Sequence, residues 1–394
     1  MKRFALPDRR VARRLFQRLA ERPPAVEPCR TDKPLVLYGA GNLGALAADM
    51  LGRLALPVAY AMDRAPSGDR LLAGRIPVLE PRQPSPEERG GHTVAVCVVN
   101  APYRPIRDAL AEMGWGHICP VYDLLEAYAD RMPIKNGWFA GPLSERDVAG
   151  IEAVLARWED DRSRAAHLQF LAWRLHRREW CFADAPVRID DRYFIGPIRE
   201  ALRPDECFLD GGAHRGAVIE RWLETAGGAF RAVLAVEPDR ENARCLRERI
   251  ARLPAGVARR IRVMECALAA RGGSQPFRHG FDLASRLEPG AADSVAAHRL
   301  DDLDFPVSFG KIHLEGGERA ALEGGMETLR RFRPLLAVTL YHDRDGLWRT
   351  AALLMELLPD YRFLLRLHAW CGTGVVLYAI PAERWVGSSA AGNR

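Results

Sequence analysis

No apolar run in the 394-residue sequence is long enough to cross a lipid bilayer, which takes about 18 consecutive residues. The apolar runs that occur, such as residues 93–99 and 335–340, have the length of a buried strand. The N-terminus, MKRFALPDRRVARRLF, is basic but lacks the apolar core and the small-residue cleavage site of a signal peptide. The sequence therefore indicates a cytoplasmic protein with no transmembrane segment.

Closely spaced cysteines are also absent. The eight cysteines are scattered along the chain and include no C-x-x-C pair. This spacing argues against a zinc-binding cysteine motif and against a disulfide framework, so we expect reduced and mostly buried thiols.

Lysine is scarce, because only four of the 57 basic residues are lysines and the others are arginines. The formal net charge of +6 is a local feature: residues 1–30 hold nine basic and three acidic residues, and the rest of the chain is balanced. A charge excess confined to one end of the chain gives no general basis for nucleic-acid binding, and we expect none.

Within this basic end, apolar residues recur on one face of a predicted helix at about residues 8–21. They are Val11, Leu15, Phe16 and Leu19. Such a pattern is typical of a helix that packs on a neighbouring domain, which is the interpretation we favour. A weak contact with an acidic membrane surface is the alternative.

The rest of the chain alternates twice between short apolar runs and helical patterns. A chain of this length exceeds one ordinary core, so the pattern predicts an α/β protein with two doubly wound Rossmann-like domains. The predicted parts are a basic helix (1–30), a nucleotide-binding-type domain (31–125), a helical linker (126–190), a second domain (191–385) and a flexible tail (386–394).

The most informative segment is FLDGGAHRG, followed by VLAVEPD. Asp210 ends a predicted strand, at the edge of the sheet where ligands bind in such folds. The glycines that follow, Gly211, Gly212 and Gly216, let the backbone approach a ligand closely. Glu237 ends the next strand, where an acid can accept hydrogen bonds from both hydroxyls of a ribose. The segment therefore predicts a nucleoside site.

The turn favours S-adenosylmethionine over a dinucleotide. A pyrophosphate is best held by a G-x-G-x-x-G turn that opens on a helix N-terminus, whereas this turn reads G-G-A-H-R-G and has Asp210 beside it. S-adenosylmethionine carries no phosphate, and an acid stabilises its sulfonium and ammonium cations.

Several segments together make the chain from about residue 160 to residue 381 resemble the FkbM family of methyltransferases. They are WEDDRS with Asp161 and Ser163, Tyr193–Phe194, DGGAHRG, EPD from Glu237, Cys266–Leu268, KIHLEGGE from Lys311, LYHDRDGLW and YRFLLRLHAWCGTGVVLYAI. The resemblance implies that the second domain is a methyltransferase with S-adenosylmethionine as cofactor. It implies these cofactor-binding residues: Asp210, Gly211, Gly212, Ala213, His214, Gly216, Glu237, Pro238, Cys266, Ala267 and Tyr193.

One position departs from the family, which usually has an aspartate where this chain has His313. This histidine either alters the activity or supplies a base, or it is simply hydrogen-bonded near a strand end. An alcohol acceptor must lose a proton, and the candidate bases are His342, then Glu315, then His313. Glu318 is more typical of a helix N-terminus. The sequence shows no convincing metal site.

An earlier segment, VLYGAGNLGALAADML, satisfies G-x-G-x-x-G through Gly39, Gly41 and Gly44, and Asp63 ends the next predicted strand. This is the context of a dinucleotide fingerprint. Together with GRIPVLEP, it resembles the nucleotide-fold domains that precede sugar-modifying transferases, some of which bind a nucleotide-sugar. A glycine turn that only allows close helix–strand packing is an equally open alternative.

We therefore expect an S-adenosylmethionine-dependent methyltransferase that O-methylates a hydroxyl of a sugar, glycan precursor or secondary metabolite. The alternatives are an NAD(P)-dependent oxidoreductase and a non-catalytic nucleotide-sugar-binding protein, both of which would use the first glycine turn. The identity of the small-molecule or glycan acceptor stays open, and so does a homo-oligomeric state.

Overall fold

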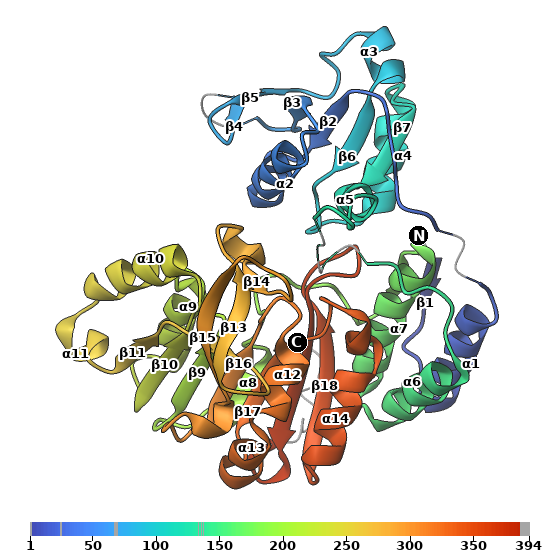
Figure 1. The fold of residues 1–394 in the computed structure, drawn as a ribbon. Coiled ribbons are helices and arrows are strands. Elements are labelled where there is room, and N and C mark those ends of the chain that lie inside the picture. Colours follow the sequence, from blue (N-terminus) through green and yellow to red (C-terminus); the bar gives the residue numbers. More distant parts are fainter. Residues whose placement is uncertain are drawn as a thin grey trace.

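The computed structural model describes residues 2–23, 26–66, 70–132, 134, 136 and 138–386. It shows two α/β units, drawn one above the other in Figure 1, and a group of helices beside the lower unit. The predicted fold class, two Rossmann-like units with a helical region between them in the sequence, is confirmed. Of the predicted tail, residues 387–394 lie outside the described part of the chain. In the part described, no helix is long and apolar enough to span a membrane.

The first unit is built on a six-stranded sheet. Its strands are β2 (Leu35–Tyr38), β3 (Val58–Met62), β4 (Leu71–Leu72), β5 (Ile76–Leu79), β6 (Thr93–Val96) and β7 (His117–Pro120). Its helices are α2 (Asn42–Arg53), α3 (Pro86–Gly91), α4 (Tyr103–Glu112) and α5 (Val121–Glu126). The order is β4-β5-β3-β2-β6-β7, and every neighbouring pair except β4 with β5 is parallel. Side chains of β2 alternate between two buried clusters, one on each face, as a central parallel strand requires.

The helices beside the lower unit are α1 (Arg9–Ala20), α6 (Glu145–Arg157) and α7 (Asp161–His176). Ala12, Phe16 and Leu19 of α1 are buried in one core with residues of α6 and α7. Gln17 of α1 donates a 2.8 Å hydrogen bond to Glu152 of α6. The docking interpretation of the basic helix is therefore confirmed, because its apolar face is covered by protein.

The second unit is built on a seven-stranded sheet. Its strands are β9 (Cys207–Gly211), β10 (Ala232–Val236), β11 (Ile261–Met264), β16 (Phe309–Ile312), β17 (Leu335–Thr339), β18 (Tyr361–Leu367) and β19 (Val375–Pro381). Its helices are α8 (Gly196–Ala201), α9 (Ala217–Ala226), α10 (Arg240–Ala251), α11 (Ala255–Ala258), α12 (Glu318–Glu323), α13 (Met326–Phe332) and α14 (Arg349–Leu357). The order is β11-β10-β9-β16-β17-β19-β18, with β19 antiparallel to both neighbours. The carboxyl ends of β10, β9 and β16 therefore lie side by side.

A small four-stranded sheet stands against these strand ends, and none of its strands is predicted from the sequence. It consists of β12 (Ala267–Leu268), β13 (Gly273–Arg278), β14 (Arg286–Leu287) and β15 (Asp293–His298). Two of its strands, β12 and β14, have only two residues each, and β13 contains both glycine and proline, which are depleted in strands. A further pair, β1 (Lys2–Phe4) with β8 (Trp180–Phe182), ties the N-terminus to the helical region.

The two units touch along the glycine turn and helix α2 of the first. Arg53 of α2 donates to the Gly280 carbonyl at 2.7 Å, and its guanidinium lies 4.2 Å from the ring centroid of Phe281. Phe281 and Ala284 are buried in the hydrophobic core of the first unit. The loop that follows β13 therefore belongs to the packing of both units.

Candidate active site

A cavity of about 690 Å³ opens at the carboxyl ends of β9, β10 and β16. Most of the predicted cofactor-binding residues line it: Tyr193, Gly212, Ala213, His214, Glu237, Pro238, Cys266 and Ala267. The lining also includes two candidate bases, His313 and Glu315. Asp210, Gly211, Gly216 and His342 are near it in the fold but are not part of its lining. The structure therefore gathers the predicted residues at one place and separates those that face the space from those that support it.

The glycine turn of this site follows β9 and needs glycine at two positions. Gly212 has a φ of +74°, and a Cβ there would lie 1.9 Å from the His313 carbonyl oxygen. Gly216 has a φ of +88°, and a Cβ would lie 2.8 Å from Leu246. Residues other than glycine are strained in this left-handed region. The turn is consequently pressed against β16 and leaves its backbone exposed to the cavity.

Glu237, which follows the end of β10, is one of the acids that line the cavity. One carboxylate oxygen accepts the His214 N–H at 2.7 Å, and the other accepts the Asp239 N–H at 2.9 Å. The side chain is 5% exposed, and burial raises the pKa of Glu237 to about 7. A carboxylate placed here is able to accept hydrogen bonds from a ribose while it fixes the turn.

Asp210 lies beneath the turn instead. It is completely buried, and its Oδ1 is 2.9 Å from Nζ of Lys311. Lys311 donates from the same nitrogen to the carbonyls of Gly211 at 3.1 Å and Gly212 at 2.6 Å. Although Lys311 opposes it, burial raises the pKa of Asp210. Asp210 therefore supports the turn indirectly, by holding the ammonium group of Lys311 against the two glycine carbonyls. Lys311 thus does more than cap the end of a strand.

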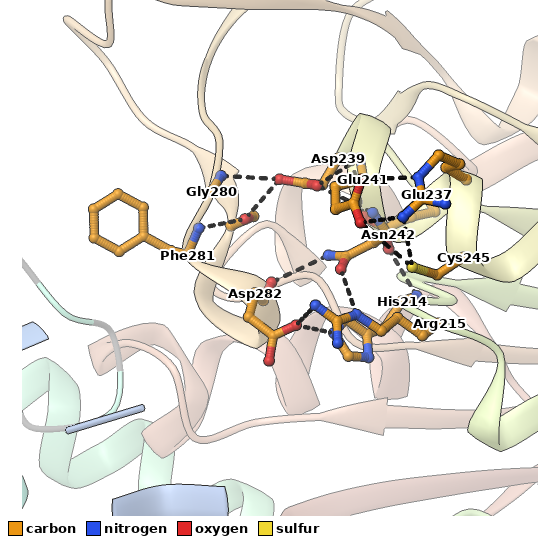
Figure 2. Close-up of polar contacts among 12 residues, drawn as sticks. His214, Arg215, Glu237, Asp239, Glu241, Asn242, Cys245, Gly280, Phe281 and Asp282 are labelled. Atoms are coloured by element: carbon orange, nitrogen blue, oxygen red, sulfur yellow. Dashed lines mark hydrogen bonds and ion pairs between the residues drawn. The ribbon is translucent and has the colours of Figure 1, made fainter. Parts of the chain in front are cut away.

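A polar network connects the loop after β13 with the glycine turn and with the start of α10, as Figure 2 shows. Asp282 accepts from His214 at 2.8 Å and pairs with Arg215 at 2.9 Å. Asn242 of α10 donates to the Asp282 carbonyl at 3.2 Å. Asp239 accepts from the Gly280 N–H at 3.1 Å. Sequence reasoning missed Asn242 and Asp282, because neither belongs to a recognisable motif and their contact depends on how the loop folds back.

Two histidines and two glutamates form a compact cluster at the ends of β16 and β17. Glu315 Oε1 lies 3.0 Å from His313 Nε2 and 3.2 Å from His342 Nε2. His342 Nδ1 is 2.6 Å from Glu318 Oε1. Burial lowers the pKa of His313 to about 3. Burial acts in the same direction on His342, but the carboxylates of Glu315 and Glu318 raise the pKa of His342 well above its usual range.

His342, the first candidate base, is 1% exposed and lies behind Glu315 when viewed from the cavity lining. His313 and Glu315 are the members of the cluster that line the space. Tyr193 joins them, because its hydroxyl is 2.7 Å from His313 Nδ1. His313 and Glu315 are therefore accessible to a substrate in the cavity. His342 lies outside the lining and contacts Glu315.

The first glycine turn has a different environment. Asp63 accepts the Ala40 N–H at 2.9 Å, so its carboxylate holds the turn together. A Cβ at Gly44 would lie 2.1 Å from the Gly39 carbonyl oxygen, whereas one at Gly41 would meet no atom within 4 Å. Asn42, in the middle of this turn, lines the cavity of the second unit.

Comparisons with known proteins agree with this geometry. Residues 210–365 match the family model described as "Methyltransferase FkbM domain". The structure of Methyltransferase FkbM from Methylobacillus flagellatus KT is similar over 95% of this chain and 94% of that one, with a TM-score of 0.61 and 20% identity. Cofactor-bound Rv0187 from MTB is similar over 66% of this chain and 96% of that one, with a TM-score of 0.33 and 15% identity. No curated protein matches the sequence.

Proposed function

We propose that the domain at residues 210–365, which matches the FkbM methyltransferase model, binds S-adenosylmethionine in this cavity and directs the methyl group to a hydroxyl oxygen of the acceptor. The observation that carries the proposal is that Glu237, His313 and Glu315 line one continuous space. In the sheet order, β9 lies between β10, which ends before Glu237, and β16, which ends before His313. The acid for the ribose and the polar pair for the acceptor thus flank the glycine turn.

The adenosine part of the cofactor fits the side of the turn that faces β10. Glu237 is available to the ribose hydroxyls, and the segment from Cys266 to Leu268 supplies a buried apolar edge for the base. The methionine part then runs past Gly212 towards Tyr193. This direction brings the sulfonium to the side where His313 and Glu315 lie.

Methyl transfer needs an in-line approach of the acceptor oxygen to the methyl carbon, so positioning and exclusion of water supply much of the acceleration. As the new oxygen–carbon bond forms, the carbon–sulfur bond breaks and the sulfur keeps the electron pair, which yields S-adenosylhomocysteine. The hydroxyl proton passes to the carboxylate of Glu315, the charged group beside His313 in the lining.

A sugar, a glycan precursor or a hydroxylated secondary metabolite is the acceptor class that we propose. Asn42 lines the cavity from the first unit, so an acceptor would contact both units. The likeness of the first unit to nucleotide-fold domains of sugar-modifying transferases supports a sugar or a nucleotide-sugar.

Two measurements test the proposal in sequence. Calorimetry with S-adenosylmethionine should give binding in the micromolar range, and its absence from the folded protein would sink the methyltransferase assignment. Release of S-adenosylhomocysteine is then followed over a panel of nucleotide-sugars, free sugars and phenols. Glu315→Gln should lower turnover at least 100-fold at unchanged cofactor affinity. The control Glu323→Gln, which changes an exposed glutamate at the end of α12, should leave turnover unchanged. Cofactor binding without turnover on any acceptor would favour the non-catalytic alternative.

A further inference from the structure

We propose that His313, Glu315 and His342 bind a divalent transition-metal ion, such as Zn²⁺, in the wall of the cavity. One potential ligand atom from each residue lies within 4.8 Å of the others. From the sequence, His313, Glu315 and Glu318 form only a loose cluster and no convincing metal site. His342 is distant in sequence and reaches Glu315 through the pairing of β16 with β17.

Two of the three distances between donor atoms fit one shared ion, and all three donor atoms lie within 4.8 Å of one another. Zinc lies about 2.0–2.2 Å from imidazole nitrogen and carboxylate oxygen, and angles of about 90–110° at the ion separate neighbouring donors by about 3.0–3.4 Å. Glu315 Oε1 is 3.0 Å from His313 Nε2 and 3.2 Å from His342 Nε2. Both distances therefore fall in the range expected for two ligands of the same ion.

His342 supplies an independent observation. Its side chain is 1% exposed, and its Nε2 is buried without a well-directed hydrogen bond to any described residue, although Glu315 Oε1 lies 3.2 Å away. A buried imidazole in that condition is unfavourable unless another ligand completes its contacts. An ion next to Nε2 would do so.

The outer nitrogens of both histidines are held in the way that metal ligands require. His313 Nδ1 is 2.7 Å from the Tyr193 hydroxyl, and His342 Nδ1 is 2.6 Å from Glu318 Oε1. Glu318 is itself fixed, because it accepts the Leu314 N–H at 3.0 Å and the Thr339 hydroxyl at 2.7 Å. Outer partners of this kind orient imidazole ligands and make them more basic. They leave His342 Nε2 directed at Glu315, whereas His313 Nε2 lies 3.0 Å from Glu315 Oε1 and 3.2 Å from the Tyr341 hydroxyl.

Two nitrogens and one carboxylate oxygen form a donor set for zinc or another first-row transition ion, and a poor one for calcium or magnesium. Since His313 and Glu315 line the cavity, the ion would have open positions on the cavity side. Its role there rests on the proposed function: the ion would hold the acceptor hydroxyl and lower the pKa of that hydroxyl, so that its proton passes more readily to the carboxylate oxygen of Glu315 that does not bind the ion.

The same contacts also fit an ion-free cluster in which His342 is a cation between Glu315 and Glu318. A binding experiment separates the two cases. The full chain is treated with chelator and titrated with Co²⁺ alone, followed by its visible absorption bands, and with Zn²⁺ alone by calorimetry. We expect one equivalent to bind, with a dissociation constant of micromolar or tighter.

Glu315→Gln and His342→Gln should each weaken this binding at least 100-fold, and Glu318→Gln about 10-fold through His342. His117→Gln, which removes an exposed histidine of the first unit, should leave it unchanged. Glu315→Gln is nearly isosteric, so it tests the site even if His342→Gln does not fold. No saturable binding by the wild-type chain would overturn the proposal, as would full binding by folded Glu315→Gln. Calorimetry with S-adenosylmethionine on the chelated protein is independent of this result and reports separately on the proposed function.

Discussion

The two glycine turns of the molecule are built alike but face different surroundings. In each, an acid at the end of the next strand accepts a backbone N–H of the turn: Asp63 accepts from Ala40 at 2.9 Å, and Glu237 accepts from His214 at 2.7 Å. The second turn lines a cavity of about 690 Å³ through Gly212, Ala213 and His214. The first contributes Asn42 to that same cavity.

In both units the acid fastens the glycine turn to the neighbouring strand. The acid has a structural role in both units, so its presence alone does not indicate a ribose. What distinguishes the second turn is the space beside Glu237. The experiments that follow separate the anchoring role from the binding role.

The largest expected difference is in the affinity for S-adenosylmethionine, between the variants Glu237→Gln and Asp63→Asn. Glu237→Gln should weaken S-adenosylmethionine binding at least 100-fold, because each hydrogen bond to a charged carboxylate contributes about 1.5–3 kcal/mol. Asp63→Asn should leave the affinity within about twofold and lower the free energy of unfolding by about 1 kcal/mol. Calorimetry and thermal melting of both variants make the comparison. An equal loss of affinity in the two variants would contradict it.

A change of about tenfold in the affinity for S-adenosylmethionine is expected between pH 6 and pH 8. Burial raises the pKa of Glu237 to about 7, so most molecules carry a protonated carboxyl at pH 6 and a carboxylate at pH 8. Affinity for S-adenosylmethionine should rise about tenfold over this interval, since the carboxylate accepts both ribose hydroxyls. Calorimetry at several pH values measures it, and Glu237→Gln should remove the part of the pH dependence that Glu237 causes.

The stability of the ligand-free protein should change in the opposite direction. Between pH 4.5 and about 7, the unfolded chain releases the Glu237 proton while the folded chain keeps it. Rising pH therefore lowers the contribution of this residue to the free energy of unfolding by about 1.4 kcal/mol per pH unit. Denaturant unfolding of the wild type and of Glu237→Gln isolates this contribution. A difference that does not vary with pH would contradict the raised pKa.

The sequence predicts the alternation of strands and helices in both units, because buried parallel strands are short apolar runs between glycine turns. It also identifies Glu237 and the glycine turn as parts of one site. It does not show that Asp210 lies beneath the turn while Glu237 faces the space, because both acids end strands and only the packed structure separates them. The contact of His342 with Glu315 depends on the register of two strands, and the small sheet depends on strands with little apolar content.

A smaller effect, on the KM of the acceptor, is expected at Asn42, which belongs to the first turn and lines the cavity of the second unit. If the acceptor contacts both units, Asn42→Ala should raise the acceptor KM about two- to tenfold, because one hydrogen bond to the acceptor is lost. The affinity for the cofactor should not change. Gln83→Ala, an exposed amide of the same unit, serves as the control. Steady-state kinetics with the acceptor found in the panel test this. An unchanged KM would confine the acceptor site to the second unit.

The smallest effect is expected at Gly41, where an added Cβ would meet no atom within 4 Å. Without a ligand at the first turn, Gly41→Ala should change neither stability nor cofactor affinity, and NADH fluorescence should show no saturable binding to the wild type. A bound pyrophosphate would instead need the close backbone approach that a glycine allows at this position. Saturable NADH binding that Gly41→Ala abolishes would therefore make the first turn a second nucleotide site. Gly44→Ala, whose Cβ would lie 2.1 Å from the Gly39 carbonyl oxygen, should destabilise the first unit in either case and shows that the assay detects damage to this turn.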